Sequence, residues 1–252
     1  MIQPVFNRQF SAVRRAKHLL WFVTRLAVLP LLRVTIGMRV YGLKNVPARG
    51  GAVVITNHLD WFDPVLLVAA GPRPIMWMAK AEIFALPVLR WFARQAGAFP
   101  VERGKPDRPA LRHAQQLLAD GLLVGVFPEG TRSRTGGLIQ PLSGASLVAV
   151  RSDAPIIPCA VVGSERLPLS GKKPAGRRRL RVTVVYGAPF RLSTRRPNGA
   201  KYALEELTDA MMIELARLLP ASYRGVYAER SLEPHTAVSR DNMQFTGVAP
   251  VS

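Results

Sequence analysis

The 252-residue sequence contains a single cysteine, Cys159. One thiol excludes an internal disulfide and any metal site built from several cysteines. Cys159 lies within an apolar run, residues 156–162, where a small buried hydrophobic residue is expected rather than a nucleophile. A reducing, cytoplasmic setting agrees with this cysteine usage.

Acidic residues are also scarce. Asp and Glu number 16 against 35 Lys and Arg, which gives a formal net charge of +19. Such an excess predicts an anionic partner, either nucleic acid or a membrane surface that carries phosphate head groups. The charge is spread over apolar segments and no nucleic-acid-binding motif accompanies it. We therefore expect membrane lipids with anionic head groups as partners, and no nucleic acid.

Several common motifs are missing. The sequence has no Gly-x-Gly-x-x-Gly, no Walker-type Gly-Lys-Ser/Thr and no internal repeat. It also has no Gly-x-Ser-x-Gly elbow, the turn that presents the serine of α/β hydrolases. The absence of that elbow argues against a hydrolase.

No apolar run is long enough to predict a membrane-spanning helix. In the apolar N-terminal region Arg25, Pro30 and Arg33 interrupt the roughly 20 residues that a span needs. Residues 1–36 instead repeat apolar side chains every three or four positions, with most arginines elsewhere on the helical wheel. We expect an amphipathic segment that lies in the membrane interface. The alternative is a helix packed on the domain's own core.

From Met38 onward, strand-like and helix-like segments alternate. This pattern predicts an α/β domain over residues 37–220, with a central mixed sheet flanked by helices. Strands are expected at residues 39–43, 52–55, 74–80, 97–103, 122–127, 156–162 and 180–186, and helices at 64–70, 82–86, 88–95, 109–120, 143–150 and 200–219. Periodicity fades after Pro220, so residues 221–252 are predicted to form a loosely ordered tail.

A polar stretch, Asn57 to Pro64, follows directly on the apolar strand at residues 52–55. Ligands of open α/β sheets bind just past the carboxyl ends of strands. Across this turn His58 and Asp63 can form an imidazole–carboxylate pair, in which the free ring nitrogen takes a proton. Alternatively, Asp63 is only the N-cap of a helix that starts at Pro64, and His58 is an ordinary partly buried histidine.

Three further stretches follow in order: Gly97 to Arg103, Phe127 to Arg132, and Ala154 to Pro158. They resemble the Gly-x5-Arg, Phe-Pro-Glu-Gly-Thr-Arg and Pro-x-x-Pro blocks of the bacterial PlsC-like glycerolipid acyltransferases, the lysophosphatidic acid acyltransferase (1-acyl-sn-glycerol-3-phosphate acyltransferase) family. The stretch at Asn57 resembles that family's Asn-His-x4-Asp motif. The resemblance covers roughly residues 38–165, and the third block is the most specific.

The resemblance implies that His58 is the general base and that Asp63 orients it. The residues that it implies for binding the glycerol phosphate are Arg103, Glu129, Gly130, Thr131 and Arg132. The planar guanidinium of arginine suits phosphate, and backbone N–H groups in the tight turn at Gly130 could face an anion. Lys80 is a further phosphate candidate, or else an ordinary lysine at a strand end.

The reaction implied by the resemblance moves an acyl chain from acyl-CoA or acyl-carrier protein to the sn-2 hydroxyl of 1-acyl-sn-glycerol 3-phosphate. The product is phosphatidic acid, an intermediate of phospholipid biosynthesis. The hydroxyl attacks directly, without an acyl-enzyme, and no metal or organic cofactor takes part. Another lysolipid or a glycolipid acceptor is the alternative. The expected location is the cytoplasmic face of the cell membrane, as a peripheral or monotopic protein.

One position departs from the family pattern. Family members often carry serine two residues after the histidine, where this chain has Asp60. A second carboxylate near His58 could raise the imidazole pKa or compete for the ring N–H. In the simplest case Asp60 points to solvent.

Overall fold

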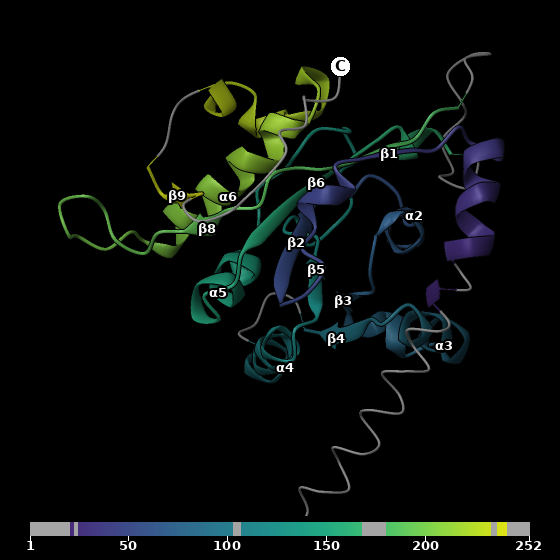
Figure 1. Ribbon diagram of the computed structural model, residues 1–252, viewed down its shortest axis with the longest axis horizontal. Helices are drawn as coiled ribbons and strands as arrows, with labels where there is room; N and C mark the ends of the chain where they lie inside the picture. Colours follow the sequence, from purple (N-terminus) through teal and green to yellow (C-terminus); the bar gives the residue numbers. More distant parts are fainter. Residues whose placement is uncertain (1–20, 23–24, 103–106, 168–179, 233–235, 241–252) are drawn as a thin grey trace, which may run out of the picture.

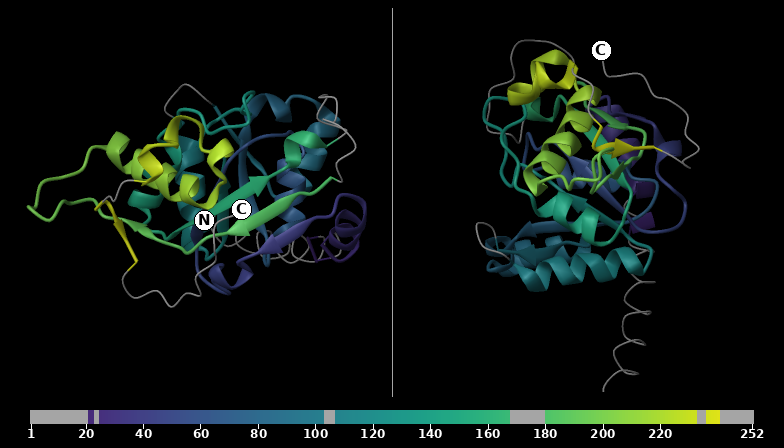
Figure 2. Two further views of the ribbon diagram at one scale, coloured as in Figure 1. Left: turned by 90° about the horizontal axis from the view of Figure 1, so that it is seen from above. Right: turned by 90° about the vertical axis from the view of Figure 1, so that its left-hand side faces the viewer.

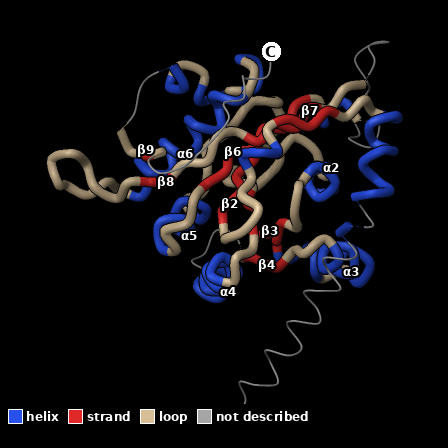
Figure 3. Tube along the Cα trace, viewed as in Figure 1, coloured by secondary structure: helices blue, strands red, loops and turns tan. Residues whose placement is uncertain are grey.

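A computed structural model describes residues 21–22, 25–102, 107–167, 180–232 and 236–240. Its centre is a seven-stranded sheet in the order β1-β7-β6-β2-β5-β3-β4, with helices on both faces (Figures 1 and 2). Neighbouring strands are parallel except β6 and β7, which run antiparallel. Strands and helices alternate along the chain, as Figure 3 shows. The predicted α/β domain with a mixed central sheet is therefore confirmed.

The sheet strands are β1 (Arg39–Tyr41), β2 (Ala52–Thr56), β3 (Ile75–Lys80), β4 (Phe99–Val101), β5 (Leu123–Val126), β6 (Ile156–Val162) and β7 (Thr183–Tyr186). The longer helices are α2 (Asp63–Ala70), α3 (Pro87–Gln95), α4 (Arg108–Ala119), α5 (Gly144–Arg151) and α6 (Leu204–Leu218). A separate two-stranded ribbon pairs β8 (Arg191–Leu192) with β9 (Val238–Ser239).

The two central strands are apolar because they are covered on both faces. Every residue of β2 and β5 is buried, as expected for strands in the middle of a mostly parallel sheet. Alternate residues of β2 face opposite layers: Val53 and Ile55 pack with α4, α5 and α6, whereas Val54 packs with α2. A side chain on Gly125 in β5 would meet the Trp77 ring, because an added Cβ would lie 2.5 Å from it.

Helical residues 25–35 pack on the same face as α2. Leu29 and Leu32 are buried in that part of the core, while Leu26 and Val34 are exposed. This stretch thus has a core-facing side, as the alternative interpretation predicted, together with an exposed apolar side. Residues 1–20 and 23–24, which carry most of the predicted amphipathic segment, lie outside the described residues. Within the described part of the chain, no helix has the length and apolar character needed to cross a bilayer.

The C-terminal region is more ordered than the sequence predicted. Three short 3-10 helices, η5 (Ala221–Tyr223), η6 (Gly225–Tyr227) and η7 (Arg230–Leu232), follow α6. Tyr227 is fully buried, and its hydroxyl donates to Asp209 Oδ1 of α6 at 2.7 Å. The prediction of a loose tail is wrong for these residues because single anchoring side chains, not a periodic pattern, hold them. Residues 241–252 lie outside the described part.

Cys159 lies in β6 and is fully buried, as predicted. Burial raises the pKa of its thiol far above the usual range, because the thiolate would lose its hydration. The thiol therefore stays protonated and serves as a small core residue.

Candidate active site

The loops that follow β2 and β5 meet at the carboxyl end of the sheet. These strands are adjacent and parallel, so their carboxyl ends lie side by side. The loops are joined directly, because the backbone N–H of Ser133 donates to the carbonyl oxygen of His58 at 2.8 Å. The structure thus brings together the His58 turn and the Phe127–Arg132 turn.

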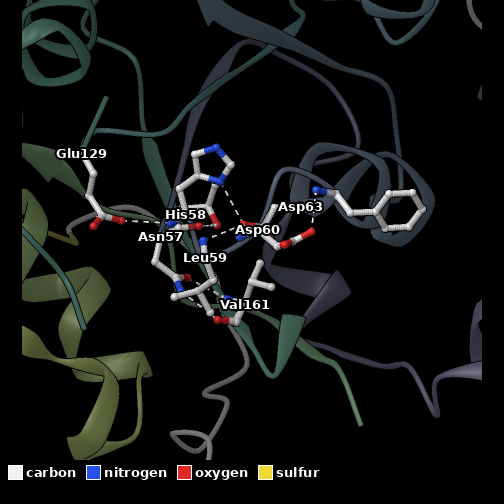
Figure 4. A network of polar contacts seen from close by, with 9 residues as sticks. Asn57, His58, Leu59, Asp60, Asp63, Glu129 and Val161 are labelled. Atoms are coloured by element: carbon white, nitrogen blue, oxygen red, sulfur yellow. Dashed lines mark hydrogen bonds and ion pairs between the residues drawn. The ribbon is translucent and has the colours of Figure 1, made fainter. Parts of the chain in front are cut away.

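His58 is paired with Asp63. The distance from His58 Nδ1 to Asp63 Oδ2 is 2.9 Å, and Asp63 is fully buried (Figure 4). The same oxygen accepts the backbone N–H groups of Leu59 at 2.7 Å and Asp60 at 2.8 Å. Three donors therefore hold this carboxylate in one orientation.

The N-cap predicted at Asp63 is wrong by one residue. Helix α2 begins at Asp63 itself, and Phe62 occupies the cap position without a side-chain bond. The Asp63 side chain reaches back into the preceding loop instead of forward into the helix. Its bonds organise the turn around His58, so its placement is more than that of a helix cap.

The pair fixes how the imidazole is used. When Nδ1–H donates to Asp63, Nε2 carries the lone pair and can take a proton. Figure 4 shows this second nitrogen pointing away from the carboxylate. The His58 side chain is 14% exposed, and its ring packs against Phe127 with a centroid distance of 4.1 Å. A largely buried base with one accessible nitrogen is the result.

Asp60 does not point to solvent, contrary to the simplest expectation. It is only 1% exposed, and its Oδ1 accepts the backbone N–H of Phe62 at 2.9 Å. Burial raises the pKa of Asp60, and the nearby charge of Asp63 adds to the effect. The ring N–H of His58 is directed to Asp63, so Asp63 is the carboxylate that orients the imidazole.

Asn57 anchors the turn from the other side. Its Nδ2 donates to the carbonyl oxygen of Val161, and its Oδ1 accepts the N–H of Val161, both at 2.8 Å. The amide thereby ties the loop after β2 to β6, 104 residues further along the chain. The sequence pattern assigns no role to Asn57; its only signal is an amide at the end of a fully buried strand.

Glu129 also acts on the backbone. Its Oε1 accepts the N–H of His58 at 2.9 Å, and its Oε2 accepts the N–H of Ile139 at 3.1 Å. Because both oxygens are used in this way, the side chain positions the His58 turn and does not present a phosphate ligand. Burial raises the pKa of Glu129 from 4.5 to about 7, and the charge of Asp63 contributes a smaller part.

We predict that Glu129→Gln alters the pH dependence of stability. The folded protein binds the Glu129 proton more tightly than the unfolded chain does, so stability from this group is full below pH 4.5 and is lost as pH rises to about 7. The loss amounts to about 3 kcal/mol in the free energy of unfolding. Denaturant titrations between pH 4.5 and 8 should show the variant gaining up to about 3 kcal/mol in stability relative to wild type as pH rises, because the neutral amide does not titrate. A constant difference would contradict the assignment.

The turn after Glu129 lines a polar cavity. Gly130 has φ +67°, which favours glycine, and its N–H donates to the carbonyl oxygen of Phe127 at 3.0 Å. The N–H of Gly130 is therefore used within the turn, and anion binding by the other backbone N–H groups of this turn stays a prediction. Thr131 and Arg132 are exposed and line a cavity of about 190 Å³. The other lining residues are Leu59, Asp60, Ser133, Arg134 and Glu165.

An apolar cavity of about 440 Å³ is lined in part by Phe127, Pro128 and Gly130 of the same turn. Phe127 connects it to the base, because the Phe127 ring packs on His58 and also lines the cavity. Its apolar lining includes Met78, Val101, Leu111, Val126, Leu142 and Leu147. These residues come from β3, β4, α4, β5, α5 and the loop before α5, a convergence that sequence spacing does not reveal. His58 itself lines neither cavity, but Leu59 and Asp60 of its turn line the polar one, and Phe127, which packs on its ring, lines the apolar one.

Two predicted phosphate ligands are not placed at the site. Lys80 ends β3 and pairs with Glu82 at 2.8 Å on the surface, and it lines neither cavity. Arg103 lies outside the described residues. Its role in phosphate binding stays a prediction.

An imidazole oriented by a buried carboxylate, at the carboxyl end of an α/β sheet, is an arrangement capable of general-base chemistry. The acyltransferase family model matches residues 37–162. This range includes both turns of the site. The chain belongs to the acyltransferase family.

Individual relatives support the assignment to the acyltransferase family. The 1-acyl-sn-glycerol-3-phosphate acyltransferase of Bacillus subtilis is 32% identical over 176 residues, which cover 69% of this chain and 84% of the relative. The chloroplastic 1-acyl-sn-glycerol-3-phosphate acyltransferase LPAT1 of Arabidopsis thaliana is 29% identical, over 65% of this chain and 46% of the relative. The crystal structure of the 1-acyl-sn-glycerophosphate acyltransferase PlsC from Thermotoga maritima superposes with a TM-score of 0.52 at 25% identity, covering 74% of this chain and 76% of that one.

Proposed function

We propose that this acyltransferase acylates the sn-2 hydroxyl of 1-acyl-sn-glycerol 3-phosphate and forms phosphatidic acid. The observation that carries the proposal is the His58–Asp63 pair, whose turn contributes Leu59 and Asp60 to a polar cavity with arginines and whose imidazole packs on Phe127 of an apolar cavity. The acceptor has a matching division, since it joins an anionic phosphate to an acyl chain. The names of the Bacillus and Arabidopsis relatives support the same substrate.

In the proposed reaction His58 Nε2 takes the proton of the acceptor hydroxyl as the oxygen attacks the carbonyl carbon of the acyl thioester. A C–O bond forms and the C–S bond breaks. The departing sulfur receives the proton from the imidazolium, which the Asp63 carboxylate stabilises at Nδ1. No acyl-enzyme forms. Direct attack needs only a base, hydrogen-bond donors and a cation, so we propose that no metal or organic cofactor takes part.

The two cavities suit different parts of the substrates. The apolar cavity suits an acyl chain, because its lining is dominated by aliphatic and aromatic side chains. The polar cavity suits the acceptor phosphate, since Arg132 and Arg134 both line it. Acyl-CoA or acyl-carrier protein would supply the thioester. Acceptors of this kind reside in membranes, so we place the protein on the cytoplasmic face of the cell membrane.

We predict that Arg132→Ala raises KM for the phosphate-bearing acceptor by about tenfold to 100-fold, because hydrogen bonds to charged groups contribute roughly 1.5–3 kcal/mol. The value of kcat should change much less, since the base is untouched. Steady-state kinetics with acceptor as the varied substrate measure this. Arg151→Ala, at the exposed end of α5 and outside both cavities, is the matched control. An unchanged KM for Arg132→Ala would remove Arg132 from the phosphate site.

The proposed acceptor is tested by giving the purified protein acyl-CoA and a panel of acceptors. The panel contains 1-acylglycerol 3-phosphate, lysophosphatidylcholine, lysophosphatidylglycerol and a lysoglycolipid. We expect the highest kcat/KM with 1-acylglycerol 3-phosphate. Preferred acylation of another member would replace the acceptor while keeping the reaction, and replacing acyl-CoA with acyl-carrier protein in parallel identifies the donor.

A further inference from the structure

The segment between β3 and β4 carries an unusual amount of exposed apolar surface. It consists of η2 (Ala81–Phe84) and α3, and none of the nine residues of α3 is buried. Val88 is 68% exposed, Trp91 58% and Phe92 60%. Ile83, Leu86 and Leu89 are exposed as well. Large apolar side chains gathered in this way on a surface indicate an interaction site.

Helix α3 lacks the buried apolar face of a helix in a soluble protein. In such a helix the apolar face is buried and the charged face is exposed. Here Arg90 is half-buried while its neighbours Trp91 and Phe92 are exposed. The helix thus turns its aromatic side chains away from the domain, which is favourable only if an apolar medium receives them.

The residue pattern fits a lipid surface. Val88, Trp91 and Phe92 are spaced i, i+3, i+4 and form one side of α3, which we call the aromatic face. Arg90 and Arg94 lie on a different arc of the helix. Tryptophan favours the boundary between head groups and acyl chains, and arginine beside it can contact lipid phosphates.

The position of this segment relates it to the active site. Strands β3, β5 and β2 are parallel neighbours. The carboxyl end of β3, where η2 begins, therefore lies at the same end of the sheet as the His58 turn. In Figure 1, α3 and helical residues 25–35 lie at the same end of the molecule's long axis. That second helix also exposes apolar side chains, among them Leu26, Leu31 and Val34.

We infer that η2 and α3 form a membrane-docking element, which inserts the aromatic face at the head-group level of an anionic bilayer. The inference rests on the proposed function, because a membrane-borne acceptor must reach the His58 turn at the carboxyl end of the sheet. Docking through α3 holds this end of the sheet close to the lipid bilayer that contains the acceptor. It adds a contact within the catalytic domain to any made by the N-terminal segment.

Charge favours a bilayer over a second copy of the chain. A two-fold symmetric dimer through the aromatic face would place the same patch against itself, so that the exposed Arg94, one turn on from Trp91, would face a like charge. An anionic bilayer supplies phosphates for the same arginine. The chain's net charge of +19 favours that surface as well.

The test is cosedimentation of the full-length protein with vesicles of phosphatidylglycerol and phosphatidylcholine. Trp91→Ser/Phe92→Ser should lower vesicle affinity at least about tenfold, because the variant lacks the two aromatic rings whose transfer from water into the bilayer favours binding. The matched control is Val226→Ser/Leu232→Ser, which removes two exposed apolar side chains from η6 and η7. Affinity should be unchanged in the control. Circular dichroism should match wild type for both, because all four side chains are exposed.

Fluorescence locates the contact. Lipids brominated near the head group should quench the wild type more than Trp91→Phe, since Trp91 then lies in the bilayer. Equal quenching together with unchanged affinity of the double variant would overturn the proposal. A second result would also overturn the proposal, in favour of an interface between two copies of the chain. In that case the double variant would keep its vesicle affinity, while a dimer of the wild type would become a monomer in the variant.

Activity separates this inference from the proposed function. On a dispersed short-chain acceptor the α3 double variant should keep wild-type turnover, and on acceptor embedded in vesicles it should be slower by at least about tenfold. Equal turnover of both proteins on embedded acceptor would contradict the docking role. Wild type that acylates neither acceptor would refute the proposed function, while vesicle affinity and quenching would still decide the docking surface.

Discussion

His58→Ala is expected to lower kcat for acyl transfer by about 10²- to 10⁴-fold, the usual contribution of a general base. The variant loses the only imidazole that the structure holds against Asp63, while the Asp63 bonds to the N–H groups of Leu59 and Asp60 can persist. The turn should therefore keep its shape. Product formation from acyl-CoA and lysophosphatidic acid, measured with purified protein, gives the ratio.

The matched control is His113→Ala. His113 lies on α4, where its ring packs edge-on against Phe99, and it lines neither cavity. It should keep kcat near wild type. Full activity of His58→Ala, or an equal loss in His113→Ala, would refute the assignment of His58 as the base.

Asp63→Asn is expected to lower kcat by a comparable factor, about 10²- to 10³-fold. The amide oxygen can still accept the N–H groups of Leu59 and Asp60, so the loop is largely kept. The negative charge opposite the imidazolium is lost, and with it the preference for the tautomer that leaves Nε2 free. Kinetics and denaturant titration on the same preparation should show a large loss of kcat with a small loss of stability.

Asp60→Asn separates the two carboxylates. Asp60 accepts the N–H of Phe62 and is as well buried as Asp63, but His58 does not donate to it. We expect kcat to change by less than about tenfold. A loss as large as that of Asp63→Asn would mean that Asp60 is the functional partner.

Much of the fold was predictable because buried strands are recorded directly in the sequence. The apolar runs at residues 52–55 and 122–127 became β2 and β5, the two central strands. Because the two strands pair in parallel, the polar residues that follow each run lie together at the carboxyl end of the sheet. The meeting of the His58 turn with the Phe127–Arg132 turn was therefore accessible from sequence pattern.

The use of individual polar atoms was not predictable. Asp63 resembled a helix cap because a proline follows it, yet its oxygen bonds to the preceding loop. Glu129 resembled a substrate residue, yet its oxygens hold the backbone of His58 and Ile139. Periodicity reports which face of an element is apolar. It carries no information on which N–H group a loop carboxylate meets.

Features assembled from many elements were also beyond the sequence. The apolar cavity takes its walls from three strands and two helices. The exposure of Trp91 and Phe92 depends on how α3 packs against η2. Read as a pattern, the same residues suggest an ordinary amphipathic helix packed against the sheet.

In the proposed mechanism His58 activates the acceptor hydroxyl for direct attack on the thioester. The most direct test follows free CoA thiol and phosphatidic acid together, first with enzyme and acyl-CoA alone and then after lysophosphatidic acid is added. Direct attack predicts no thiol before the acceptor is present, and then one thiol for each phosphatidic acid. A burst of thiol without acceptor, accompanied by an acyl group on the protein in its intact mass, would contradict the claim.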